Sequence, residues 1–158
     1  RWNRLAHSPP LHRLHYLIIL AYTNSMTECV FCKIVKKEIP AEIVYEDNGF
    51  LAFLDIKPVN LGHTLLIPKK HHEMLVDAPD KLLSQAIVLV KKLIVAIKKA
   101  TGADFAVLSV VGIDVPHLHF HILPRYHDDG LANFWPTKTA TAEEQKQIAE
   151  KIKGALGK

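Results

Sequence analysis

The chain has 158 residues, of which 49% are hydrophobic and 23% are charged, a composition typical of one globular domain and unlike that of a disordered chain. Two cysteines are too few for a disulfide scaffold, and no run approaches the roughly 18 apolar residues of a membrane span. The net charge is +4, but without Arg1, Arg4 and Arg13 only 17 of the 20 basic residues remain against 16 acidic ones, which argues against a basic nucleic-acid-binding face.

The first 25 residues differ in character from the rest of the chain. Arg13 precedes an apolar run from Tyr16 to Tyr22, which raises the alternative of a secretory signal. The run is short, however, and residues 23–25 make a poor cleavage site. We interpret residues 1–25 as a weakly ordered or non-native extension, followed by a single domain over residues 26–158 that begins at Met26.

The first half of this domain contains a short helix or turn and three predicted strands. Residues 29–37 form the helix or turn, which ends before Pro40 because the residue before a proline avoids the helical region. The alternation of side chains and a turn at residues 47–49 favour strands with the following bounds: Glu42–Glu46, Phe50–Asp55 and Gly62–Pro68.

A long helix is predicted over Ala78–Ala100. Its apolar residues follow the 3.6-residue period: Leu82, Ala86, Ile87, Val90, Leu93, Ile94 and Ile97. Asp77 and Asp80 lie at its positive end, and Gly102 is placed to cap it. Three further residues widen the apolar face, which indicates either a subunit contact or a helix buried on most sides: Val88, Leu89 and Val95.

The second half adds two strands and a terminal helix. The strands are expected over Phe105–Val111 and Pro116–Leu123, and the helix over Ala142–Leu156. Thr141, with Glu144 three residues later, predicts a capping box at the start of that helix. Strands before and after one central helix indicate an α+β domain with a mainly antiparallel sheet.

The predicted strand at residues 116–123 contains three histidines at alternate positions. Because side chains alternate between strand faces, these rings share one face: His117, His119 and His121. The apolar residues between them face the other way: Leu118, Phe120 and Ile122. Besides a solvated, histidine-rich strand, this pattern fits a metal site with an open position or a nucleophile for a phosphate. The spacing alone does not decide between them.

The two cysteines stand in a C-x-x-C pair, Cys29 and Cys32. The region of His71 and the first strand histidine, His117, can supply two more ligands for a tetrahedral zinc ion, with His72 as an alternative to His71. Such a site is closed and therefore structural, and it leaves the other two strand histidines for chemistry. The alternatives are two buried thiols and a redox pair, although a redox C-x-x-C is expected after a strand in a thioredoxin-like βαβ unit.

Six ordered segments resemble the histidine-triad family of nucleotide hydrolases and transferases. The pattern His-φ-His-φ-His-φ-φ, in which φ is apolar, fits at every position of residues 117–123. The supporting segments are Cys29–Ile34, Glu38–Pro40, Val44–Asp47, Leu51–Ile56, Gly62–Lys69 and Val115–Arg125. The resemblance implies a half-barrel of about five antiparallel strands with one long central helix and a C-terminal helix, commonly as a homodimer.

The same resemblance implies roles for individual residues. The central histidine, His119, would be the nucleophile on the α-phosphorus of a purine nucleoside monophosphate and would form a nucleotidyl-histidine intermediate. His121 would contact the phosphate and His63 would support it. The ribose would be bound by Asp55, whose alternative role is to cap a turn. Four residues would form an apolar wall around the base, or else only core: Phe31, Ile34, Phe53 and Ile56. Structural zinc would be held by Cys29, Cys32, His71 and His117.

The segment before the triad departs from the family pattern. Residues 108–115 lack the family's glycine-rich loop with its Asn and Gln-Ser contacts, and Asp114 stands three residues before the triad. Ser109 would replace part of the lost polar contact. We therefore expect a phosphoramidase-like hydrolase, with a dinucleoside polyphosphate hydrolase, a non-catalytic nucleotide-binding module and a zinc hydrolase as alternatives. The expected setting is the cytoplasm, with a purine nucleotide as partner and without nucleic acid or membrane.

Overall fold

The computed structural model describes residues 29–131 and 140–155. The predicted extension at residues 1–25 and the last residue of the predicted terminal helix, Leu156, lie outside these ranges. The chain divides into a unit up to His127 and a second from Asp128, and each is described by itself. Within the described ranges, no helix is both long and apolar enough to cross a membrane.

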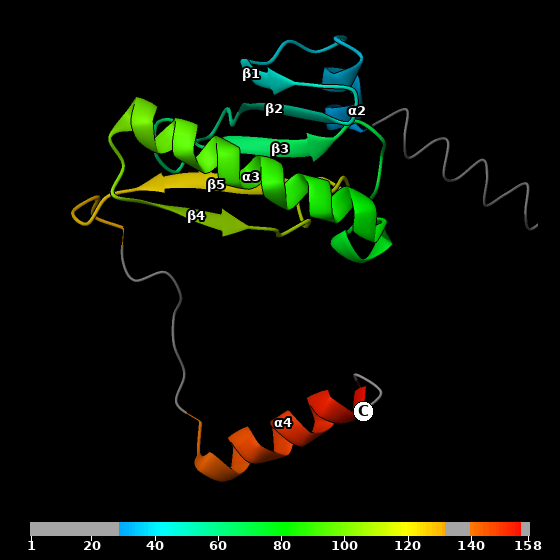
Figure 1. Cartoon of the computed structure of the whole chain (residues 1–158), viewed down its shortest axis with the longest axis vertical. Helices are drawn as coiled ribbons and strands as arrows, with labels where there is room; N and C mark the ends of the chain where they lie inside the picture. Colours follow the sequence, from blue (N-terminus) through cyan, green and yellow to red (C-terminus); the bar gives the residue numbers. More distant parts are fainter. Residues whose placement is uncertain (1–28, 132–139, 156–158) are drawn as a thin grey trace, which may run out of the picture. The chain divides into compact units, whose positions relative to one another are not determined.

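The first unit is built on a five-stranded sheet in the order β1-β2-β3-β5-β4 (Figure 1). Every neighbouring pair of strands is antiparallel. The strands are β1 Ile43–Glu46, β2 Phe50–Leu54, β3 Thr64–Pro68, β4 Phe105–Ser109 and β5 Phe120–Arg125. The predicted α+β class and the antiparallel sheet of about five strands are therefore confirmed.

The sheet carries a different helix on each face. The short helix α2, Val30–Val35, packs with Leu51 and Phe53 of β2, whereas the long helix α3, Asp80–Thr101, packs with Phe50 and Ala52 of the same strand. This follows from the two-residue period of a strand, which sends successive side chains to opposite faces. Figure 1 shows α3 running across the strands of the sheet.

Helix α3 buries only one of its sides. Its buried residues are Ala86, Leu89, Val90, Leu93 and Ile97, and Gly102 caps it in the left-handed conformation. Ile87, predicted on the core side, is 50% exposed. Val88 and Val95 are more exposed, at 56% and 64%. The predicted alternative of a helix buried on most sides is therefore wrong for the single chain, because one sheet face covers only one side of a helix. Asp77 belongs to the preceding 3-10 turn, Leu75–Asp77, and not to the start of α3.

The histidine strand begins later than predicted. Strand β5 starts at Phe120, not at Pro116, and it extends past Leu123 to Arg125. Before it, the Leu118 N–H donates to the carbonyl of His72 in a loop and does not join a strand ladder. The predicted alternation still holds, because three side chains enter the core that α3 covers: Leu118, Phe120 and Ile122.

The second unit contains helix α4, Ala142–Ala155. The Thr141 N–H donates to Glu144 Oε2 at 2.7 Å, and the Glu144 N–H donates to Thr141 Oγ1 at 3.2 Å. These reciprocal bonds form the predicted capping box and satisfy two backbone donors at the helix start.

Gly62, directly before His63, is expected to be intolerant of a side chain. It has a φ of +96°, and a Cβ atom there would lie 2.8 Å from Thr101 Cγ2. Gly62→Ala should therefore lower the free energy of unfolding by about 2 kcal/mol, measured by denaturant titration. Gly49→Ala is the matched control, since the nearest atom to its Cβ lies at 3.7 Å. Equal losses in the two variants would contradict the steric explanation.

Candidate functional site

Most of the predicted site residues gather on the sheet face that carries α2. Phe31 of α2 makes edge contacts with the rings of His117 and His119, at centroid distances of 5.9 and 5.3 Å. The pairing of β3 with β5 places Leu65 opposite His121, and the rings of His63 and His121 lie 5.2 Å apart. The histidines therefore line a continuous row beside α2, opposite the face covered by α3.

Four buried side chains form one potential metal-binding group: Cys29, Cys32, His71 and His117. Their ligand atoms all lie within 4.8 Å of one another. Cys29 Sγ is 3.4 Å from His117 Nδ1, and Cys32 Sγ is 3.3 Å from His71 Nδ1. For tetrahedral zinc the sulfur-to-nitrogen separation is about 3.6 Å, so the four residues fit this ion. His72 is buried beside them but is not a member of the group.

Hydrogen bonding sets the tautomer of His117. Its Nε2 lies 2.9 Å from the carbonyl oxygen of Pro68, which can only accept, so Nε2 carries the proton and Nδ1 presents its lone pair to both sulfurs. Burial lowers the pKa of His117 to about 4, which keeps the ring neutral near pH 7. Burial, followed by the charge of Cys29, raises the pKa of the Cys32 thiol to about 11. A bound cation would reverse this effect on the thiol, since zinc binds thiolates.

A backbone carbonyl also orients His119. Its Nδ1 lies 2.6 Å from the carbonyl oxygen of His117, so Nδ1 donates and the lone pair is on Nε2. The ring is 5% exposed and lines a pocket of about 90 Å³ with Glu73, Met74 and Val111 among its walls. His119 therefore combines a fixed tautomer with a free nitrogen, which are the properties of a nucleophilic imidazole.

His121 belongs to a second group with His63 and Asp55. His63 Nε2 is 3.0 Å from His121 Nδ1, and Asp55 Oδ2 is 3.6 Å from His63 Nδ1. The Val59 N–H donates to His63 Nδ1 at 3.4 Å, which leaves the His63 proton on Nε2, facing His121. The neutral ring of His121 then carries its own proton on Nε2, where it can donate to an oxygen of a ligand.

Stability should fall in acid because of His121. Burial, followed by the charges of His119 and His63, lowers its pKa from 6.5 to about 4. The unfolded chain then binds the proton more readily, so the stability present above pH 6.5 is lost as the pH falls toward 4. At about pH 5 the loss should be about 1 kcal/mol after allowance for partial exposure. Denaturant unfolding of His121→Gln should show a smaller loss between about pH 7 and pH 5, and an unchanged loss would contradict this assignment.

The remaining predicted residues have different surroundings. Phe31, Ile34 and Phe53 are buried in one apolar cluster with the two cysteines, whereas Ile56 is 92% exposed and lies outside it. Asp55 Oδ1 accepts the Lys57 N–H at 2.8 Å, so the turn-capping role is present in addition to the contact with His63. Ser109 pairs with His121 across β4 and β5. The carboxylate of Asp114 lies close enough to His121 to raise its pKa, although burial outweighs this effect.

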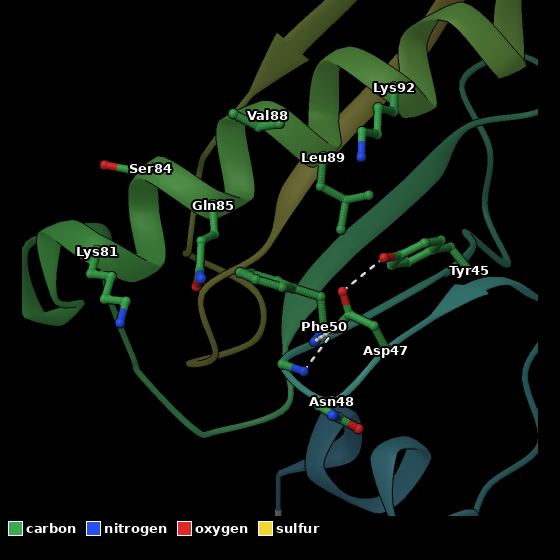
Figure 2. Close-up of a pocket in the computed structure, with 11 residues that line it drawn as sticks. Tyr45, Asp47, Asn48, Phe50, Lys81, Ser84, Gln85, Val88, Leu89 and Lys92 are labelled. Carbon is green, nitrogen blue, oxygen red and sulfur yellow. Dashed lines mark hydrogen bonds between the residues drawn. The ribbon is translucent and has the colours of Figure 1, made fainter.

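A larger open pocket of about 810 Å³ lies on the other face of the sheet, between α3 and the turn from β1 to β2 (Figure 2). Lys81, Gln85 and Lys92 of α3 line it opposite Tyr45 and Asp47, whose side chains are hydrogen bonded at 2.7 Å. It contains none of the predicted site residues. The histidine row is therefore the candidate site.

Sequence reasoning missed the groups that orient the histidines. These are the carbonyls of Pro68 and His117 and the N–H of Val59. Because every residue carries the same backbone groups, residue type gives no signal for them.

The chain is similar in sequence and in structure to known proteins. The family model described as HIT domain matches residues 36–128. An uncharacterised HIT-like protein of Methanocaldococcus jannaschii is 44% identical, over 80% of this chain and 99% of that protein. The adenosine 5'-monophosphoramidase of Saccharomyces cerevisiae is 36% identical, over 80% of this chain and 84% of that protein. The crystal structure of a zinc-bound histidine triad family protein from Mycobacterium smegmatis matches with a TM-score of 0.65 and 30% identity. The match covers 82% of this chain and 98% of that protein.

Proposed function

The chain belongs to the HIT domain family, and we propose that it is a phosphoramidase that hydrolyses amidates of purine nucleoside monophosphates. The general class of reaction, nucleotide hydrolysis, is supported by the family and by relatives named adenosine 5'-monophosphoramidase. The choice of the α-phosphorus rests on the geometry of the histidine row, and the choice of amidates rests on the carboxylates near it.

The observation that carries the proposal is the free Nε2 of His119. Its lone pair attacks the α-phosphorus while Nδ1–H remains bonded to the His117 carbonyl. The new nitrogen–phosphorus bond forms as the bond from phosphorus to the leaving nitrogen breaks, and that nitrogen takes a proton from solvent. Water then attacks the nucleotidyl-histidine, which releases the nucleoside monophosphate and restores the free ring. His121 donates its Nε2 proton to a phosphoryl oxygen, and His63 holds it in that tautomer.

The same face offers partners for the rest of a nucleotide. Asp55 Oδ1 accepts the Lys57 N–H, whereas Oδ2 accepts no backbone N–H among the described residues and can accept from a ribose hydroxyl. Phe31, Ile34 and Phe53 provide an apolar wall for the base, whereas Ile56 is 92% exposed and lies outside their cluster. Ser109, which pairs with His121 on the neighbouring strand, offers a hydroxyl to the phosphate.

Zinc is assigned a structural role. Cys29, Cys32, His71 and His117 would hold it, and four protein ligands leave no open position for a substrate. Its contribution is to fix His117, whose carbonyl oxygen orients His119. The metal itself takes no part in the chemical steps.

Carboxylates near the histidine row favour amidates over dinucleoside polyphosphates. Glu73 lines the pocket beside His119, and Asp114 acts on His121 through its charge. Negative charges at these positions repel a polyphosphate leaving group and attract an amine, which is often cationic. A non-catalytic nucleotide-binding module is the alternative, because the polar loop of the family is missing before the triad.

The test compares two substrate classes on the same chain. Turnover of an adenosine monophosphate amidate should exceed that of diadenosine polyphosphates by at least about tenfold in kcat/KM, a difference of about 1.4 kcal/mol. Rapid quenching should capture adenylyl-histidine. The reverse preference would support the polyphosphate hydrolase, and tight binding of adenosine monophosphate without a covalent species would support the binding module.

A homodimer is proposed as the assembly. Ile87 and Val95 of α3 and Leu108 of β4 are exposed apolar side chains in the single chain, and β4 has no strand partner on its outer side within the described residues. Pairing with a second copy would cover both features. Sedimentation equilibrium checks this, and a monomer at micromolar concentration would contradict it.

A further inference from the structure

A second group of metal-ligating side chains lies outside the Cys2His2 group. It consists of Asp55, His63 and His121, whose ligand atoms all lie within 4.8 Å of one another. His63 is buried, while Asp55 and His121 are half-buried and accessible to an ion. We propose that these three residues form a second, exchangeable site for a divalent transition metal ion, and that binding of the ion excludes the nucleotide.

The separations suit one ion after small side-chain rotations. At zinc-to-ligand bond lengths near 2.1 Å, two ligand atoms of a tetrahedral site lie about 3.4 Å apart. Asp55 Oδ2 is 3.6 Å from His63 Nδ1, close to that value. His121 Nδ1 now lies 3.0 Å from His63 Nε2, and the ligand atoms of the three residues lie within 4.8 Å of one another, so binding of one ion would replace this hydrogen bond and draw the His121 nitrogen toward the Asp55 side of His63.

The donors are also supported by neighbouring groups. Asp55 Oδ1 accepts the Lys57 N–H, which fixes the carboxylate and leaves Oδ2 for an ion. The Val59 N–H donates to His63 Nδ1 at 3.4 Å, so this nitrogen already presents its lone pair, and the ion would take the place of that long hydrogen bond. Outer contacts of this kind orient metal ligands in established sites.

The donor set defines the class of ion. Two imidazoles and one carboxylate suit Zn²⁺, Ni²⁺ and similar ions better than Mg²⁺ or Ca²⁺, which prefer oxygen ligands. Three protein ligands leave an open coordination position for water. The ion would therefore exchange with solution, in contrast to an ion enclosed by the four buried ligands of the Cys2His2 group.

Exclusion of the nucleotide rests on the proposed function. Asp55 cannot bind a ribose hydroxyl freely while it ligates a cation, and a His121 ring turned toward the ion cannot donate to the phosphate. The metal and the nucleotide would therefore compete for the same side chains. Free transition metal would act as a reversible inhibitor of the hydrolase.

The experiment is a calorimetric titration of the zinc-loaded full chain with Ni²⁺, with the zinc content measured before and after. The chain should bind one more equivalent of Ni²⁺ than His63→Ala. Asp55→Asn, which conserves size, should weaken that equivalent at least about tenfold, since even outer-shell changes have effects of this size. His127→Ala, which removes an exposed histidine, is the matched control and should retain it. Equal Ni²⁺ binding by the wild-type chain, His63→Ala and Asp55→Asn would overturn the second site.

Competition separates this inference from the proposed function. Adenosine monophosphate should raise the apparent Kd of the wild-type chain for the Ni²⁺ equivalent that His63→Ala loses. If amidate hydrolysis proceeds but no such equivalent exists, the metal inference fails and the proposed function stands. If the equivalent exists but the nucleotide leaves its Kd unchanged, the exclusion is wrong, and so is the placement of the nucleotide on Asp55 and His121.

Discussion

Replacement of His119 by alanine is expected to reduce amidate hydrolysis by roughly 10⁴-fold or more. In the proposed mechanism the ring supplies the attacking nitrogen, and no other described histidine combines a free nitrogen with a position in the middle of the row. His117 turns its free nitrogen toward the two cysteines, and His121 is bonded to His63. Loss of the nucleophile therefore removes the covalent route and not merely one contact of the substrate.

Single-turnover kinetics and acid-labile labelling of the protein measure this effect. The wild-type chain should accumulate adenylyl-histidine, and His119→Ala should show none. His127→Ala, which changes an exposed histidine away from the row, is the matched control and should keep both rate and label. Amidate turnover at an undiminished rate in His119→Ala would refute the mechanism and leave the zinc group unaffected.

The second large effect is expected from removal of the zinc ligands. The double variant Cys29→Ser/Cys32→Ser should lose its bound zinc, and its free energy of unfolding should drop by at least about 4 kcal/mol. The reason is that an ion held by the proposed ligands would connect α2 to two distant segments. His71 lies 39 residues from Cys32, and His117 lies 88 residues from Cys29. Without the ion, two thiols and two imidazoles remain buried together.

Metal analysis and denaturant titration measure these two losses. His72→Ala is the matched control, because His72 is buried next to a ligand but lies outside the group. It should retain one zinc per chain, and loss of the ion from this variant would show that the wrong histidine is assigned. If the double variant does not fold, a chelator should lower the Tm of the wild-type chain. An unchanged Tm after zinc removal would contradict the structural role.

The fate of the chemistry in the zinc-free protein distinguishes two mechanisms. The folded double variant should still form adenylyl-histidine, since His119 is unchanged. The reaction should be slower, because the His117 carbonyl that orients His119 is less firmly held. A catalytic zinc bound by all three triad histidines would instead require complete loss of activity. The geometry disfavours that alternative, since His119 lies outside the Cys2His2 group.

Much of the fold and of the site was predictable from residue types. The alternation of apolar and histidine residues at positions 117–122 predicted the two faces correctly, since a strand-like backbone sends successive side chains to opposite sides. The C-x-x-C pair and two histidines predicted the buried metal-binding group. Thr141 and Glu144 predicted the capping box of α4. In each case the required chemistry belongs to side chains at a regular or recognisable spacing.

Other features followed only from the tertiary structure. Strand β5 begins at Phe120 because Leu118 is bonded to His72, and Ile87 is half-exposed because the sheet covers one side of α3. The tautomers of His117 and His119 depend on two carbonyl oxygens, those of Pro68 and His117. Residue identity therefore determined which rings are present and which face they share. The folded backbone decided which nitrogen of each ring is free, because carbonyl groups are alike in every residue and only their positions differ.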